Sequence, residues 1–257
     1  IGEFMGVEIF LNNKGKFTKL ESPIGLEKGW WSALKITDVN GDGLADLIIG
    51  NHGENSRFKA SKTMPIALFV KDFDSNGALD PILSFTGADG KYYPYNLRHN
   101  LIDQIKGLKK LFPDYNSFKN ADLNAIFTKE VLDQSLKLVA NEMKTSIYLN
   151  LGQLKFKSID LPKAVQMAPV FAIETDDFDH DGDIDIVMGG NLFRVKPEVG
   201  RYDASFGIYL ENIGSGKFSS TPGNKGLKVR GEIRSIQIVN NKLLFARNSD
   251  SLSLYTF

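Results

Sequence analysis

Aspartate and asparagine residues recur with the same spacing in three nine-residue loops: loop one (38–46), loop two (72–80) and loop three (177–185). Each loop has oxygen-bearing side chains at positions 1, 3, 5 and 9 and a glycine at position 6. Ca²⁺ is a hard cation that takes about six to eight oxygen ligands, and a glycine permits the sharp reversal that such a loop needs. We therefore predict one Ca²⁺ site per loop, formed by these four side chains and the backbone carbonyl at position 7.

The three glycines, Gly43, Gly77 and Gly182, fix the register of the loops. In loop three, the position of Gly182 makes Asp177, rather than the adjacent Asp176, the first ligand. We expect two or three structural Ca²⁺ ions in total. The predicted ligands are Asp38, Asn40, Asp42, the Leu44 carbonyl and Asp46; Asp72, Asp74, Asn76, the Ala78 carbonyl and Asp80; and Asp177, Asp179, Asp181, the Asp183 carbonyl and Asp185.

Two other interpretations of the loops are ordinary turns without metal and EF-hands. Asp, Asn and Gly also suit ordinary turns without metal, but clustered carboxylates without a cation repel one another and raise their own pKa values. An EF-hand needs flanking helices and a bidentate Glu at position 12. That position holds Ile49, Leu83 and Met188, which are typical of strands. The pattern therefore indicates loops between β-strands.

A second unit, made of a strand, a Gly/Asn turn and a strand, repeats at residues 9–17, 147–156 and 208–218 and predicts hairpins. Phe17 precedes Asp38 by 21 residues, and Phe156 precedes Asp177 by the same 21. The same interval from Phe218 leads into 236–245, which keeps strand, turn and strand without aspartates. The repetition predicts an all-β fold, a β-propeller or propeller fragment of about four blade-like repeats, the fourth metal-free.

Two segments depart from a regular repeat. Only 34 residues separate Asp38 from Asp72, too few for a four-stranded blade, so we expect the outer strands of that blade to be short or missing. Residues 97–143 are expected to form a helical insertion that either packs on the sheets or offers a partner surface. The apolar residues at helical spacing are Leu101, Ile102, Ile105, Leu108 and Leu111 before Phe112-Pro113, and then Val131, Leu132, Leu136 and Val139.

The composition excludes several classes of protein. The 257 residues are 42% hydrophobic and 24% charged, which is typical of globular domains, and the lack of cysteine excludes disulfides and thiolate metal sites. Equal numbers of acidic and basic residues argue against nucleic-acid binding, and no apolar run reaches the roughly 18 residues that membrane insertion needs. Residues 1–4, before Met5, resemble an expression-vector remnant, so we expect one propeller-like domain over residues 5–257 of a longer protein.

With these motifs the chain resembles the FG-GAP/VCBS repeat family, known from integrin α-subunit propellers. It is most similar to the C-terminal region of bacterial relatives of cartilage acidic protein with an ASPIC/UnbV segment, through residues 201–205 and 231–234. The resemblance implies Ca²⁺ between the first two strands of a blade, an extracytoplasmic location (secreted, periplasmic or cell surface) and a protein-interaction scaffold. The hairpin around Phe10 and Phe17 either pairs with residues 243–245 and 252–255 to close a ring or leaves the ring open.

The residues do not predict an enzyme, because His52, His99 and His180 are scattered and none lies in a motif with a nucleophile and an orienting acid. The alternative function is a glycan-binding or glycan-processing module, in which aromatic and arginine side chains line a sugar or carboxylate site. Such side chains serve equally well in blade packing. The residues of this site would be Trp30, Trp31, Tyr92, Tyr93, Arg194, Arg201, Arg230 and Arg234. The partner, protein or glycan, is left open.

Overall fold

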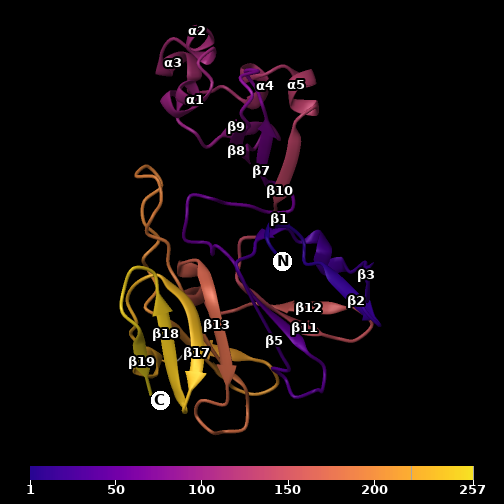
Figure 1. Cartoon of the computed structure of the whole chain (residues 1–257), viewed down its shortest axis with the longest axis vertical. Helices are drawn as coiled ribbons and strands as arrows, with labels where there is room; N and C mark the ends of the chain where they lie inside the picture. Colours follow the sequence, from indigo (N-terminus) through magenta and orange to yellow (C-terminus); the bar gives the residue numbers. More distant parts are fainter. Residues whose placement is uncertain (221, 257) are drawn as a thin grey trace. The chain divides into compact units, whose positions relative to one another are not determined.

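The computed structural model describes residues 1–220 and 222–256 and divides the chain into two compact units (Figure 1). Unit 1 combines Ile1–Arg57 with the segment from Met143 onward, and unit 2 is Phe58–Glu142. The chain is mostly β-structure in antiparallel sheets, with a few short helices. The predicted fold class, a propeller fragment of blade-like sheets with helices added, is confirmed.

The first blade of unit 1 is a four-stranded sheet in the order β12–β11–β6–β5. It consists of β5 (Ala33–Thr37), β6 (Asp46–Gly50), β11 (Ser146–Asn150) and β12 (Phe156–Ile159), and loop one joins β5 to β6. The expectation that its outer strands are short or missing is wrong. The chain leaves the blade after β6, forms unit 2, and returns to add β11 and β12.

The second blade of unit 1 has its four strands in chain order, β13 (Val170–Asp176), β14 (Asp185–Gly190), β15 (Ile208–Asn212) and β16 (Phe218–Ser220). Loop three joins β13 to β14. The third sheet contains β17 (Ile233–Val239), β18 (Lys242–Arg247) and β19 (Ser253–Tyr255). Its first turn places Asn240 and Asn241 at φ 50° and 56°, as a tight type I′ hairpin requires. The predicted strand, turn and strand of the fourth module are therefore present.

The inner strands of unit 1 are apolar on both faces because blades cover them on both sides. On β14, Ile186 and Met188 pack with Ile48 of the first blade. Val187, which points to the opposite face, packs with Ile233 of the third sheet. Alternate residues of a strand face opposite sides, so β14 forms the centre of a layered core. Short 3₁₀ helices connect the blades: η1 (Pro23–Leu26), η2 (Lys163–Met167) and η3 (Pro222–Gly226).

Unit 2 has its own four-stranded sheet, in the order β10–β7–β8–β9. Its strands are β7 (Ile66–Lys71), β8 (Asp80–Thr86), β9 (Tyr92–Pro94) and β10 (Leu136–Ala140), and loop two joins β7 to β8. Five short helices precede β10: α1 (Arg98–Gln104), α2 (Leu108–Leu111), α3 (Tyr115–Phe118), α4 (Leu123–Ile126) and α5 (Lys129–Asp133). Helices and sheet share one hydrophobic core, in which Phe69 and Ile82 meet Leu101 and Leu123.

The helices lie within the predicted segment, but they are shorter than expected. The first expected helix is divided into α1 and α2, because Ile105 has extended backbone angles. In the second, Val131 and Leu132 lie in α5, whereas Leu136 and Val139 belong to β10, which pairs with β7. Strand pairing in the folded unit outweighs a weak helical pattern here. The compact unit that contains the helices also begins well before residue 97 and includes loop two.

Two small sheets complete unit 1. The hairpin of β2 (Ile9–Asn13) and β3 (Lys16–Leu20) forms as predicted, and β1 (Glu3–Met5) pairs with β4 (Gly29–Trp30). Within residues 1–220 and 222–256, no strand other than β3 pairs with β2, so the hairpin does not join β18 and β19 to close a ring. Among the same residues, no helix is long and apolar enough to cross a membrane.

Candidate metal centre

The aspartate at position 9 of each loop is the first residue of a strand and is buried. Asp46, Asp80 and Asp185 begin β6, β8 and β14. The strand ladder fixes the backbone of each, opposite Thr37, Lys71 and Asp176 respectively. The sheet therefore positions this carboxylate, and the loop folds back over it.

The same carboxylate closes the loop through its second residue. The amide of Val39 donates to Asp46 Oδ2 at 3.0 Å, and the amide of Phe73 donates to Asp80 Oδ2 at 3.0 Å. In loop three, the amide of Phe178 bonds to Asp185. Position 9 thus anchors the start of the loop as well as its end.

The aspartate at position 1 organises the middle of each loop by accepting the amide of the glycine at position 6. The distances from Oδ2 to the glycine nitrogen are 2.7 Å for Asp38 and Gly43, 2.9 Å for Asp72 and Gly77, and 3.1 Å for Asp177 and Gly182. The three glycines have φ of 84°, 90° and 97°, a region that L side chains rarely adopt. The glycine is required by this reversal of the chain.

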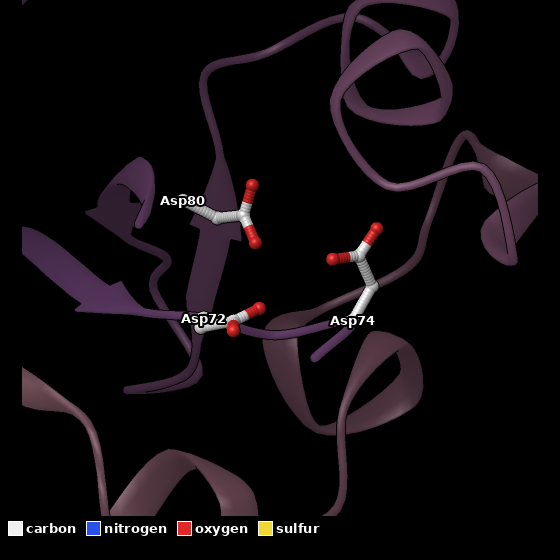
Figure 2. Close-up of side chains that lie close together, drawn as sticks. All are labelled: Asp72, Asp74 and Asp80. Carbon is white, nitrogen blue, oxygen red and sulfur yellow. The ribbon is translucent and has the colours of Figure 1, made fainter. Parts of the chain in front are cut away.

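Carboxylates at positions 1, 3 and 9 converge in loops two and three. One oxygen each from Asp72, Asp74 and Asp80 lies within 4.8 Å of the others, and Figure 2 shows these side chains turned toward a common space. Asp177, Asp179 and Asp185 form the equivalent group in loop three. All donors are hard oxygens, which fit Ca²⁺ better than softer metals.

Loop one brings fewer carboxylates together because position 3 is Asn40. The Asn40 side chain accepts the amide of Asp42 and donates Nδ2 to Asp42 Oδ2 at 3.0 Å. Position 5 behaves alike in all three loops, since its side-chain oxygen accepts the amide of position 7. These pairs are Asp42 with Leu44, Asn76 with Ala78, and Asp181 with Asp183.

The ionisation of these carboxyls follows from their surroundings. Burial raises the pKa of Asp46 and of Asp185, and the neighbouring loop acids add to the effect. Asp38 is partly exposed, and the backbone amides that donate to it, above all that of Gly43, lower its pKa. A buried carboxylate beside other acids is a costly anion without a nearby cation, so the loops favour a cation at this point.

Two asparagines that the sequence analysis did not single out fasten the outer hairpin to the loop. The amide of Asn150 donates to Asp46 Oδ1 at 2.7 Å, and its Nδ2 donates to the Ala45 carbonyl. Asn212 does the same with Asp185 Oδ1, at 2.9 Å, and with the Ile184 carbonyl. We call Asn150 and Asn212 the clamp asparagines. Their signal in the sequence is an asparagine two residues before the hairpin glycine in both repeats.

Loop three has two further neighbours. The hydroxyl of Tyr209, whose pKa burial raises, donates to Asp185 Oδ2 at 2.6 Å. Lys225 Nζ lies 3.2 Å from Asp179 Oδ2 and 3.8 Å from Glu211 Oε1, and its hydrogen bond with Asp179 raises its pKa. No local motif links Lys225 to a loop some forty residues earlier, so the sequence alone offered no signal for it.

The four arginines have separate partners. Arg234 donates to the Asn191 carbonyl and to Glu232. The other contacts are Arg234 with the Phe171 ring, Arg201 with Phe193 at 4.1 Å, Arg230 with Phe206 at 5.7 Å, and Arg194 with Ser249 Oγ at 3.2 Å. These contacts anchor loops and strands of unit 1.

The aromatic and histidine residues are likewise distributed over the fold. Trp31 is buried in the core of unit 1, and its indole donates to the Met5 carbonyl. Tyr92 and Tyr93 lie on β9 of unit 2. The histidines are found in three different surroundings: His52 beside Trp30 and Tyr202, His99 bonded to Tyr115, and His180 at an exposed position in loop three.

A family model matches part of the chain. Residues 29–63 match the family model of the FG-GAP repeat. The matched segment includes β4, β5, the whole of loop one and β6. No curated protein matches the chain. The match supports the FG-GAP family for this segment, and with it an integrin-like propeller repeat, which is a structural rather than a catalytic unit.

Proposed function

We propose that this chain is a calcium-binding FG-GAP/VCBS module that acts as an extracytoplasmic protein-interaction scaffold and not as an enzyme. The observation that carries the proposal is the repetition of one loop geometry at three places, two of which bring three carboxylates within 4.8 Å. The FG-GAP match to the segment that contains loop one supports it independently.

The residues that would hold the ion are the side chains at positions 1, 3, 5 and 9 and the carbonyl at position 7. Five protein positions supply most of the roughly six to eight oxygens that Ca²⁺ takes. Little room is left for a substrate, so a structural role fits better than a catalytic one. When bound, the ion would neutralise buried charge such as that of Asp185 and fasten the first two strands of the blade together.

The location follows from the type of site. Short surface loops of this kind are typical of extracellular modules, whose dissociation constants lie at about 10⁻⁴–10⁻³ M, and such sites fill only where calcium is abundant. We therefore place the chain outside the cytoplasm. Among proteins with these repeats, we propose the bacterial relatives of cartilage acidic protein as the nearest group.

Thermal unfolding in the presence of chelator tests the central proposal. A ligand that binds only the folded state raises its stability by mass action, so excess EDTA should lower the melting temperature and added Ca²⁺ should restore it, with Mg²⁺ as the control cation. Calorimetric titration of the metal-free chain should then show two or three sites. An unchanged melting temperature in EDTA, with no heat of Ca²⁺ binding, would contradict the proposal.

The glycan alternative makes a different prediction. Each of the four arginines contacts partners of its own in unit 1, which supports an anchoring role. In calorimetric titrations with a polysaccharide panel we expect no saturable binding. Saturable sugar binding would favour a lectin, and release of products would favour an enzyme.

A further inference from the structure

The hairpin β2–β3 has the register of the outer half of a blade. In β11–β12 the clamp asparagine Asn150 lies opposite Phe156, and in β15–β16 Asn212 lies opposite Phe218. In β2–β3 the corresponding pair is Asn12 opposite Phe17. The stretch Ile9-Phe10-Leu11-Asn12 also matches Ile147-Tyr148-Leu149-Asn150 residue by residue.

Asn12 also accepts the amide of a turn glycine, three residues on, whereas the clamp asparagines accept that of a glycine two residues on. Its Oδ1 accepts the amide of Gly15 at 2.8 Å. Asn150 Oδ1 accepts the amide of Gly152, and Asn212 Oδ1 accepts the amide of Gly214. In those two residues the backbone amide and Nδ2 are directed to an Asp loop. The register of β2–β3 therefore directs the backbone amide of Asn12 to the open edge of β2.

What β2 lacks is the inner strand. β11 pairs with β6, and β15 pairs with β14, but within residues 1–220 and 222–256 β2 pairs with β3 alone. The opposite edge, that of β3, is equivalent to the outer edges of β12 and β16, which end their sheets. Of the two edges of this hairpin, only that of β2 departs from the pattern of the complete blades.

The side chains show the same difference. Phe10 is 51% exposed, whereas Tyr148 at the equivalent position is 3% exposed and packs with Ile49 of the inner strand. Leu11 is 55% and Phe17 64% exposed, whereas Leu149 and Phe156 are partly buried against core clusters. Phe10 and Phe17 lie on one face of the hairpin and Leu11 on the other, so both faces expose apolar side chains whose equivalents in the complete blades are covered.

We propose that the edge of β2 is a docking site for the inner hairpin of a further repeat, a strand, Asp loop and strand that pairs antiparallel with β2. Its closing aspartate would accept the amide of Asn12, as Asp46 accepts that of Asn150 and Asp185 that of Asn212. Its second strand would cover Phe10 as β6 covers Tyr148.

The contacts of this chain argue against a second copy as the occupant. Each of the four inner hairpins in the described segments already has a third strand: β6 pairs with β11, β8 with β9, β14 with β15, and β18 with β19. A second copy has no inner hairpin to offer unless it breaks one of these pairings. The occupant is therefore a repeat hairpin from outside these 257 residues.

A tethered hairpin tests the proposal. A second copy of residues 33–50 would be joined ahead of Ile1 by a Gly/Ser linker of about fifteen residues, which gives an effective concentration in the millimolar range. In the register of β11 on β6, the amides of Phe10 and Asn12 face the open edge, whereas the amide of Leu11 faces β3. Residue-resolved hydrogen exchange should slow at least tenfold at Phe10 and Asn12, with Leu11 unchanged.

Two matched proteins serve as controls. The same linker without the hairpin should leave exchange at Phe10 and Asn12 fast. The substitution Phe10→Lys in the tethered protein should abolish the gain, because a charged side chain cannot be buried beneath the incoming strand, while the β2–β3 pairing remains.

Two results would overturn the proposal. One is unchanged exchange at Phe10 and Asn12 in the tethered protein. The other is concentration-dependent protection of these amides in the chain without a tether, which would assign the edge to a second copy. The bond from Asn150 to Asp46 joins two protein groups, so the exchange of Phe10 and Asn12 is measured both in EDTA and in Ca²⁺, whereas calcium binding itself is tested separately by the melting temperature.

Discussion

Asn212 is the residue that connects two of the loops. Its Nδ2 donates to the Ile184 carbonyl of loop three and, at 2.8 Å, to the Val39 carbonyl of loop one. Asn212 is buried, whereas Asn150 is partly exposed and its Nδ2 donates to its own loop, at the Ala45 carbonyl. One side chain thus links loops one and three, which belong to adjacent blades.

We therefore expect Asn212→Ala to lower the free energy of unfolding by roughly 1–3 kcal/mol, because two carbonyls lose their donor. Urea denaturation measures this, and Asn150→Ala is the matched control with a smaller expected loss. Equal losses for the two variants would show that the bridge to Val39 contributes nothing.

We expect the free energy of unfolding to depend on pH through His52. Burial lowers its pKa from 6.5 to about 4. As the pH falls from about 6.5 toward 4, the unfolded chain takes up a proton that the folded chain resists, so the free energy of unfolding decreases, by at most about 3 kcal/mol. Urea denaturation at pH 7 and pH 5 should show the decrease, and His52→Gln should reduce it.

At the scale of the elements, each nine-residue loop needs the glycine at position 6 for its backbone conformation. Gly77 in loop two has φ of 90° and open space where the methyl group of an alanine would lie, so Gly77→Ala costs backbone strain alone, about 1 kcal/mol. Gly107, also in unit 2 and also with open space, has φ of −58°. Thermal unfolding should show a loss for Gly77→Ala and none for Gly107→Ala. Equal effects would mean that the reversal does not need glycine.

Loop three should be the most sensitive to loss of its acids. The double substitution of Asp177→Ala with Asp181→Ala removes the ligands at positions 1 and 5 and the bonds that they accept from Gly182 and Asp183. Calorimetry should show one Ca²⁺ fewer and a lower melting temperature. Asp183→Ala is the control, because position 7 is expected to bind through its carbonyl. An unchanged stoichiometry in the double variant would remove loop three from the proposed sites.

The loops and hairpins could be predicted because their signals are local. The spacing of aspartates and glycine in loop one, and the turn residues Asn240 and Asn241, determine short-range geometry. The course of the first blade could not be predicted in this way, because the pairing of β6 with β11 depends on residues far apart in the chain. Lys225 bonds to Asp179, 46 residues earlier, and Asn212 to Val39, 173 residues earlier, so their roles emerge only once the strands are placed.

The whole molecule combines two units, of which unit 2 interrupts a blade of unit 1. The chain ends at this junction are held within unit 1: the Gly53 amide donates to the Met143 carbonyl at 2.8 Å, and the Asn51 amide donates to Thr145 Oγ1 at 3.0 Å. Hydrogen bonds within unit 1 therefore hold the segments that lead into and out of unit 2 next to each other, with no contribution from unit 2.

We predict that replacing residues 58–142 with a short Gly/Ser linker leaves unit 1 folded. Closure of a short loop between neighbouring ends costs little entropy. Circular dichroism should show a cooperative thermal transition, and calorimetry should retain the Ca²⁺ binding of loops one and three. A non-cooperative transition would mean that unit 1 requires unit 2 to fold.

The interrupted blade also affects events on the ribosome. β5 and β6 emerge early, but their partner β11 begins only at Ser146, after all of unit 2 has been made. At about 5–20 residues per second, nascent β6 waits several seconds with an unpaired edge. Early folding of unit 2 would shorten the span that β11 must cross to reach β6. The inserted unit thus determines when, during translation, the first blade can be completed.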